Sequence, residues 1–134
     1  MDLLQVIETI ASGISVNPNI YAMWLEGSWA TGKNNEHSDI DVWLDVEDGC
    51  FDSCIAYFRD ELKKVGDIDW EDARGIYSEN PKLIKQIFHL AGFPKDQTVE
   101  LDIQEHSRNF VFNKNDHIIK VIFDKNGTII WGKN

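Results

Sequence analysis

The chain has 134 residues, of which 43% are hydrophobic and 27% charged, and its formal net charge is −10. This size and composition predict a single globular domain over residues 1–134. The acidic surplus argues against nucleic acid as a partner, because proteins that follow a phosphate backbone carry basic faces. The sequence shows neither a charged-then-apolar leader nor a long apolar run, so we expect a cytoplasmic protein without membrane partners.

The first half of the chain alternates helical and strand patterns. Apolar residues at helical spacing over 3–14 predict an amphipathic helix. The stretch "IYAMWLEG" (20–27) predicts a buried strand that ends at Gly27. In "DIDVWLDV" (39–46) apolar residues alternate with polar residues and tryptophan, which predicts a strand with one buried face. A further apolar stripe over 51–65 predicts a second helix.

The second half is richer in strand patterns. The acidic stretch "DIDWEDARGIYSENP" (67–81) lacks periodicity and predicts a solvated loop with a short strand. "KLIKQIFHLAG" (82–92) and "TVELDIQEH" (98–106) predict two strands joined by a turn. "HIIKVIFDKNGTIIW" (117–131) predicts a C-terminal β-hairpin. The order of elements predicts an α+β fold in which helices pack on one face of a mixed sheet.

Two carboxylates stand out within the stretch "GSWATGKNNEHSDID". Asp39 and Asp41 share one strand face at roughly 7 Å spacing. Such an oxygen-rich pair suits Mg²⁺, which would offset the repulsion between the two charges. Upstream, Gly27 permits a tight turn, and Ser28 begins a short helix whose free N–H groups can face a phosphate. We therefore expect one element to bind phosphate and the adjacent strand to bind its metal.

The pattern of "GS", ten intervening residues and "DID" resembles the signature of the polymerase-β-like nucleotidyltransferase superfamily. It is most similar to the minimal and antibiotic-modifying members. The resemblance covers residues 20–46 firmly and residues 83–105 more loosely, where "ELDIQ" supplies a third acid. It implies the nucleotidyltransferase fold. It also implies transfer of a nucleoside monophosphate, expected to be AMP, from a nucleoside triphosphate to an acceptor hydroxyl.

The resemblance also implies roles for individual residues. Asp39, Asp41 and Asp102 would be the catalytic acids and would bind two Mg²⁺ ions, for which Mn²⁺ can substitute. The nucleotide-binding residues would be Gly27, Ser28 and Lys33.

A second acid, Glu100, lies on the same face of the later strand as Asp102. We expect Asp102 to be the acid that aligns with Asp39 and Asp41, with its carboxylate within about 5 Å of theirs. The flanking residues Leu101 and Ile103 should anchor that position against the core, whereas Glu100 should be solvated.

The sequence leaves the acceptor open. One hypothesis is a hydroxyl on a small molecule such as an aminoglycoside or lincosamide antibiotic. A second is a protein acceptor, as in minimal nucleotidyltransferase antitoxins. A third is a nucleotide-binding or interaction module without turnover, because a lone Asp-x-Asp also occurs on ordinary solvated strands. An acceptor pocket could form at a homodimer interface or against a partner protein.

Overall fold

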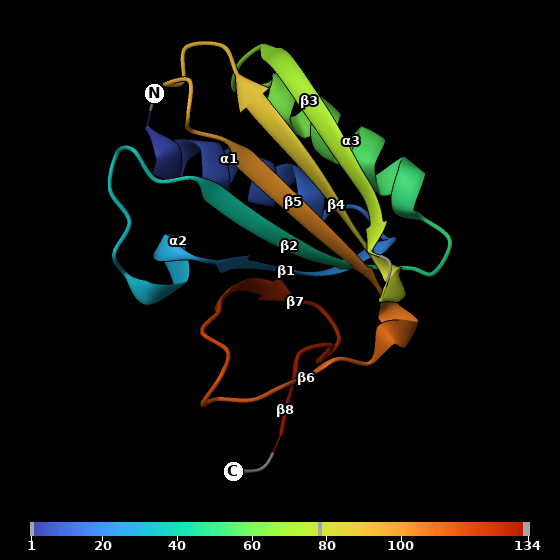
Figure 1. The fold of residues 1–134 in the computed structure, drawn as a ribbon. Helices are drawn as coiled ribbons and strands as arrows, with labels where there is room; N and C mark the ends of the chain where they lie inside the picture. Colours follow the sequence, from blue (N-terminus) through green and yellow to red (C-terminus); the bar gives the residue numbers. More distant parts are fainter. Residues whose placement is uncertain (1, 78, 133–134) are drawn as a thin grey trace.

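The computed structural model describes residues 2–77 and 79–132 and contains a six-stranded mixed sheet (Figure 1). Its strands follow the order β3-β4-β5-β2-β1-β7. They are β1 (Ile20–Glu26), β2 (Ile40–Val46), β3 (Ile68–Tyr77), β4 (Asn80–Leu90), β5 (Val99–Glu105) and β7 (Lys120–Asp124). Strands β2 and β5 are parallel, and the other neighbours in this sheet are antiparallel. The predicted α+β class is confirmed.

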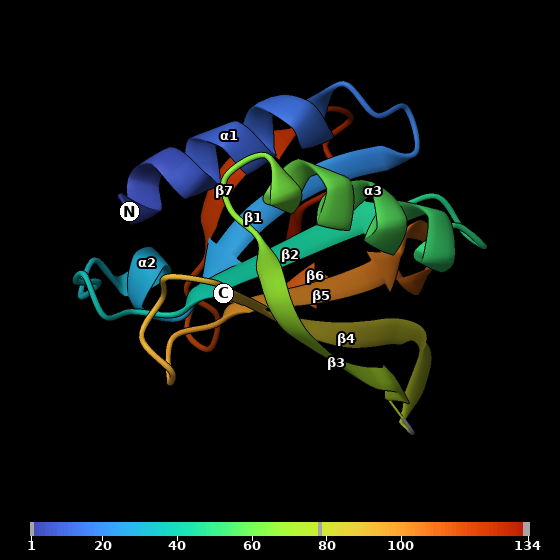
Figure 2. The same ribbon diagram turned by 90° about the horizontal axis from the view of Figure 1, so that it is seen from above.

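Two helices, α1 (Leu3–Ser15) and α3 (Phe51–Lys63), cover one face of the sheet (Figure 2). The Asp2 carboxylate caps α1 by accepting a hydrogen bond from the Leu4 N–H at 3.0 Å. The apolar stripe of each helix packs into the main core, as the 3.6-residue periodicity predicts. Across the described ranges, no helix has the length and apolar character needed to cross a membrane.

The alternation along β2 decides which residues face the helices. Its even-numbered residues, Ile40 to Val46, are completely buried in the core beneath α1 and α3. Successive side chains of a strand point to opposite faces, so Asp41 and the other odd-numbered residues of β2 point to the helix-free face. The fold therefore confines the acids of this strand to one side of the sheet.

Strand β3 corrects the expectation of a solvated loop over residues 67–81. It pairs with β4 along its length, although its sequence is acidic. Glu71 receives hydrogen bonds from the Arg59 guanidinium at 2.6 and 3.0 Å and from the Gln86 amide at 2.6 Å. These partners come from α3 and β4, so tertiary contacts that a local pattern cannot show outweigh the weak strand propensity of the segment.

The predicted C-terminal hairpin is wrong. Strand β7 pairs with β1, whereas β8 (Ile130–Trp131) pairs in parallel with β6 (Val111–Phe112) in a separate two-stranded sheet. The Asp124 carboxylate accepts hydrogen bonds from the N–H groups of Thr128 and Ile129 at 2.7 and 2.9 Å, which turns the chain away from β7.

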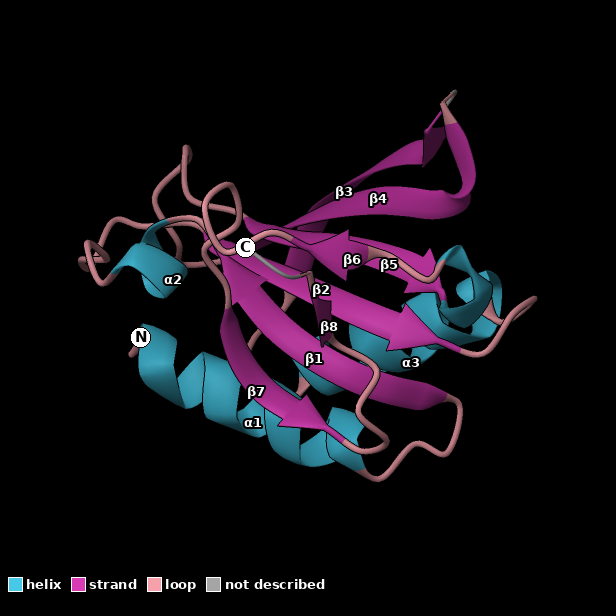
Figure 3. Ribbon diagram, turned by 90° about the horizontal axis from the view of Figure 1, so that it is seen from below, coloured by secondary structure: helices cyan, strands magenta, loops and turns pink. Residues whose placement is uncertain are grey.

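The small sheet instead covers the helix-free face of β1 (Figure 3). Phe112 of β6 packs edge-on against Trp24 of β1 at 5.5 Å between ring centroids. Trp43 of β2 stacks on Trp24 from the side, at 5.8 Å. The chain reaches β6 through the 3₁₀ turn η1 (His106–Arg108), which follows β5. The burial of Trp24 beneath the small sheet thus explains why residues 125–131 leave the expected hairpin.

We predict that Phe88→Ala destabilises the protein strongly. Phe88 is fully buried on β4 and contacts Phe58 of α3 at 5.6 Å between centroids, so its truncation leaves a cavity between sheet and helix. The free energy of unfolding in urea should fall by about 3–5 kcal/mol. The control is Leu4→Ala on the outer face of α1, where Leu4 is 47% exposed, and it should change this free energy little. Equal losses in the two variants would contradict the placement of the core.

Candidate active site

The turn after β1 brings the backbone against an acid of β2. Gly27 has a φ of +66°, in the left-handed region that favours glycine. Its carbonyl accepts hydrogen bonds from the N–H groups of Ala30 and Thr31, which closes the short helix α2 (Ser28–Thr31). A Cβ atom on Gly27 would lie 2.2 Å from Asp41 Oδ2. The glycine is therefore required by both the turn and the closeness of Asp41.

Asp39 connects the beginnings of the two parallel strands. It immediately precedes β2, and its Oδ1 accepts a hydrogen bond at 2.8 Å from the backbone N–H of Thr98, which immediately precedes β5. This bond fixes one oxygen of Asp39 toward β5 and leaves its other oxygen as a potential ligand. Asp39 and Asp41 thus lie at the same end of the sheet as the Gly27 turn.

The strand register places Glu100, instead of the expected Asp102, opposite Asp41. Asp41 is paired with Glu100 of β5, whereas Asp102 is paired with Trp43, one pleat further along. The carboxyl groups of Asp41 and Glu100 share a hydrogen bond. The expectation that Asp102 aligns with Asp41 is therefore wrong, because β2 and β5 begin level with each other and the second residues of both strands meet.

Asp102 instead forms an ion pair with a lysine. Its side chain is 4% exposed, and its Oδ2 lies 3.3 Å from Nζ of Lys85 on β4. The same Nζ lies 3.2 Å from Oε1 of Glu100. Burial disfavours the charge of Lys85, but the two carboxylates outweigh it and raise the pKa of this lysine above its ordinary value. Lys85 is thus a fixed positive charge between Glu100 and Asp102.

Asp41 keeps its proton to a higher pH than an ordinary carboxyl group does. Burial, the hydrogen bond to Glu100 and the nearby charges of Glu100 and Asp39 raise the pKa of Asp41 to about 7. A proton on Asp41 relieves its repulsion with Glu100 and Asp39, as a bound cation would do in its place.

These residues fit a magnesium ion chemically. Asp39, Asp41 and Glu100 offer oxygen ligands, and burial with the neighbouring acids raises the pKa of Asp41, which a bound cation would lower again. In the part of the chain that the structure describes, no three acidic, histidine or cysteine side chains already converge as a metal cage. Binding would require Asp41 to lose its proton.

The expected nucleotide-binding residues follow one another around the turn. Ser28 begins α2 directly after Gly27, and its carbonyl accepts the Lys33 N–H at 3.0 Å. Lys33 itself is exposed in the connection to β2. This places a serine hydroxyl and a lysine side chain on the segment that also brings Gly27 against Asp41.

A second polar network supports the other end of β2. Asp45 is 1% exposed and accepts hydrogen bonds from Gln104 at 2.8 Å and His106 Nδ1 at 2.8 Å. Burial raises the pKa of Asp45, although both hydrogen bonds oppose the shift. Arg108 in turn donates to Gln104 at 2.7 Å. Asp45 is thus a buried anchor between β2, β5 and η1, rather than a solvated strand-end acid.

Sequence reasoning missed Lys85 and Thr98 and expected Asp102, rather than Glu100, to lie opposite Asp41. Lys85 lies two positions before Ile87, the residue paired with Glu100. The antiparallel pairing of β4 with β5 therefore places Lys85 opposite Asp102. The two stretches "DIDVWLDV" and "TVELDIQE" have the same length. If they are placed side by side as parallel strands, Asp39 lies opposite Thr98 and Asp41 lies opposite Glu100.

Comparison with protein-family models and with curated proteins found no match. The function is therefore inferred from the residues and their geometry.

The two left-handed glycines of this turn provide a matched test. Gly32 has a φ of +77°, and no described heavy atom lies within 4 Å of a Cβ placed on it. We predict that Gly32→Ala costs only the backbone strain, about 1–2 kcal/mol of unfolding free energy. Gly27→Ala should cost more, because its backbone conformation, with a ψ of −144°, disfavours alanine further and its methyl group also displaces Asp41. Equal losses in urea unfolding would contradict the close approach.

The raised pKa of Asp41 predicts how stability depends on pH. The native state binds the proton more tightly than the unfolded chain between the ordinary carboxyl pKa of 3.8 and about 7. Linkage then makes the free energy of unfolding fall as pH rises through this window. Asp41→Asn removes this dependence, so its stability relative to the native sequence should increase from pH 4 to pH 8. A constant difference in urea unfolding across that range would refute the assignment.

Proposed function

We propose that this protein is a Mg²⁺-dependent nucleotidyltransferase that moves a nucleoside monophosphate, expected to be AMP, from a nucleoside triphosphate to an acceptor hydroxyl. The observation that carries the proposal is the parallel register of β2 and β5, which joins Asp41 to Glu100. It brings together the glycine turn, the Asp-x-Asp pair and a third acid at one end of the sheet. This combination matches the family pattern that the sequence resembles.

Each residue has a distinct binding role in this proposal. The turn at Gly27 and Ser28, with the charge of Lys33, would bind the outer phosphates of the triphosphate. Asp39, Asp41 and Glu100 would hold the magnesium ions. When bound, the ions supply positive charge that polarises the α-phosphate and stabilises the departing pyrophosphate.

The reaction itself is a single displacement at phosphorus. The acceptor hydroxyl oxygen forms a bond to the α-phosphorus, and the bond from that phosphorus to the oxygen bridging to the β-phosphate breaks. Pyrophosphate leaves with the electron pair, and the hydroxyl proton passes to a carboxylate of the site and then to water. Glu100 suits this role, because it lies on the side of Asp41 away from the Gly27 turn.

Asp102 and Lys85 would then act by positioning Glu100. The ion pair with Asp102 holds the Lys85 ammonium at 3.2 Å from Glu100. The lysine restrains the direction of the Glu100 carboxylate and moderates the negative charge of the site. Asp102 is accordingly proposed as the partner of a lysine, in place of its expected role as third metal ligand.

The position of Lys85 also favours a second candidate function. Because the ammonium already neutralises part of the acidic cluster, the domain could bind nucleotide or a partner protein without turnover. The two functions differ in whether labelled nucleoside monophosphate becomes attached to an acceptor. Assays with Mg²⁺, labelled triphosphates and small-molecule or protein hydroxyl acceptors separate them.

We predict that Mg²⁺ together with ATP raises the melting temperature of the native sequence, because a ligand that binds only the folded state stabilises it by mass action. Asp39→Asn, Asp41→Asn and Glu100→Gln should each remove most of this increase. The matched controls are Asp60→Asn and Glu8→Gln, both exposed on the helices of the opposite face, and they should keep it.

The outcome for Glu100 separates the two assignments of the third acid. If Glu100→Gln responds to Mg²⁺ and ATP like the native sequence while Asp102→Asn does not, the register-based assignment is wrong. If none of the site variants alters the response, the nucleotide binds elsewhere and the proposed function fails.

A further inference from the structure

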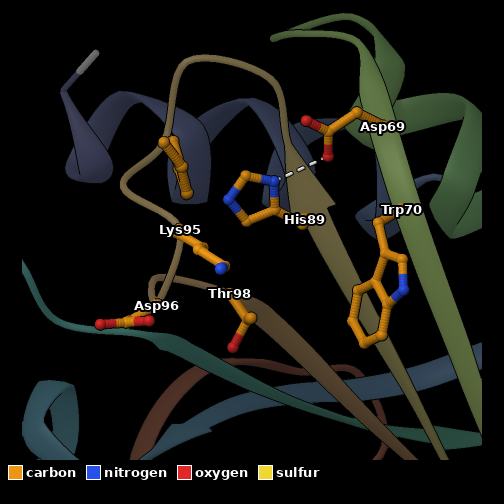
Figure 4. A pocket seen from close by; sticks show the side chains of 7 residues that line it. Asp69, Trp70, His89, Lys95, Asp96 and Thr98 are labelled. Carbon is orange, nitrogen blue, oxygen red and sulfur yellow. Dashed lines mark hydrogen bonds and ion pairs between the residues drawn. The ribbon is translucent and has the colours of Figure 1, made fainter.

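A cavity of about 640 Å³ adjoins the proposed catalytic site. It lies among the amino end of β3, the carboxyl end of β4 and the 91–98 connection (Figure 4). Trp70 and His89 form one side of it, and Thr98 closes the edge nearest to β2 and β5. Its volume is within the range of pockets that bind small organic molecules.

Thr98 joins this cavity to the proposed metal-binding acids. Its backbone N–H donates to Asp39, and it precedes Glu100 by two residues, so both side chains leave the same face of the sheet. His89 likewise shares a face of β4 with Lys85, the lysine that contacts Glu100. The cavity therefore opens on the helix-free face, next to the acids.

The strand order places the cavity opposite the phosphate-binding turn. Gly27 ends β1 on one side of Asp41, whereas β5, β4 and β3 follow on its other side. Displacement at phosphorus is in line, so the attacking hydroxyl must approach from the side opposite the departing pyrophosphate. With pyrophosphate at the Gly27 turn, the acceptor would arrive across Glu100, from the direction of the cavity.

We propose that this cavity is the acceptor subsite and that it takes a hydroxyl-bearing compound with a flat apolar ring. The assignment as acceptor subsite rests on the proposed nucleotidyltransferase function. The indole of Trp70 supplies a surface for stacking, since this residue is 50% exposed although it lines a cavity. Phe93, which is 8% exposed, adds a buried apolar wall.

The charges around the cavity favour an uncharged ring over a polycationic amino sugar. His89 bonds the Asp69 carboxylate at 2.7 Å and the Pro94 carbonyl at 3.0 Å, and these two bonds raise its pKa. When protonated, the imidazole ring balances the charge of Asp69. The remaining charged side chains of the lining, Lys95 and Asp96, have opposite signs. The lining thus has little net charge with which to attract a polycation.

The same contacts exclude His89 as the base of the reaction. Both of its ring nitrogens are occupied, one by a carboxylate and the other by a backbone carbonyl. A doubly bonded imidazolium has no free nitrogen to accept a proton. His89 therefore holds β3, β4 and the following turn together as the wall of the cavity.

The test uses N-acetyl-L-tyrosinamide, an uncharged phenol, as the binding probe. Its titration into ¹⁵N-labelled protein should shift the indole N–H signal of Trp70, identified by its absence in Trp70→Ala. That variant should bind the probe about fivefold more weakly, as expected for loss of an aromatic stacking partner. Trp131→Ala, which removes a tryptophan on β8, should bind it normally. An aminoglycoside that shifts the Trp70 signal when the phenol does not would overturn the proposed ligand class.

A second measurement locates the probe relative to the catalytic site. With Mn²⁺ and a non-hydrolysable ATP analogue bound, the ring protons of the phenol should relax faster, because a paramagnetic ion lies nearby. If metal and nucleotide stabilise the protein but leave this relaxation unchanged, the cavity is not the acceptor subsite and the proposed function survives. If metal and nucleotide do not bind at all, the proposed function fails together with the acceptor role. In that case, a shift of the Trp70 indole N–H signal when the phenol is added to Asp41→Asn would still demonstrate an aromatic-binding cavity.

Discussion

The parallel pairing of β2 with β5 is the constraint on which the candidate site depends. The first residues of the two strands are paired with each other. The hydrogen bond from Thr98 N–H to Asp39 fixes this relative position just before the paired residues begin. Parallel register then brings Asp41 beside Glu100 and moves Asp102 one pleat away. A shift of the register by one residue would turn Glu100 and Asp102 toward the core, so the apolar face of β5 enforces this arrangement.

The helix-free face concentrates charge that the fold balances in two ways. Near the Gly27 turn, burial and the neighbouring acids raise the pKa of Asp41 to about 7, so its charge depends on pH near neutrality. Further along, Lys85 pairs with both Glu100 and Asp102, and its raised pKa keeps it charged at neutral pH. The proposed metal position therefore combines the pH-dependent charge of Asp41 with a Glu100 carboxylate that Lys85 already contacts.

Periodicity predicted the elements whose burial comes from local pattern. An apolar face that packs into the core is visible in the sequence of each of these elements, and it suffices to predict them. They are the helices α1 and α3 and the strands β1, β2, β4 and β5. Only a short strand within a loop was expected at β3, because the contacts of its Glu71 with Arg59 and Gln86 come from other elements. The prediction of a C-terminal hairpin was wrong because Phe112 packs against Trp24, and β8 follows Phe112 into the small sheet.

Only the part of the candidate site that lies within one strand-turn-strand segment could be predicted from the sequence. The nearness of Asp39, Asp41 and Gly27 follows from a strand-turn-strand segment, whereas the choice between Glu100 and Asp102 depends on the register between strands separated by about half the chain. A sequence pattern gives that register only once the two strands are known to be parallel neighbours. Lys85 and Thr98 depend on the same pairing, and the cavity beside Trp70 depends in addition on β3.

The most direct test of this account is a crystal structure with Mn²⁺ and a non-hydrolysable ATP analogue, in which anomalous scattering locates the metal. The account predicts manganese bound by Asp41 and Glu100, with the triphosphate at the Gly27 turn and Lys85 still paired with Asp102. Manganese bound by Asp102 with Glu100 turned to solvent, or no metal at these acids, would contradict it.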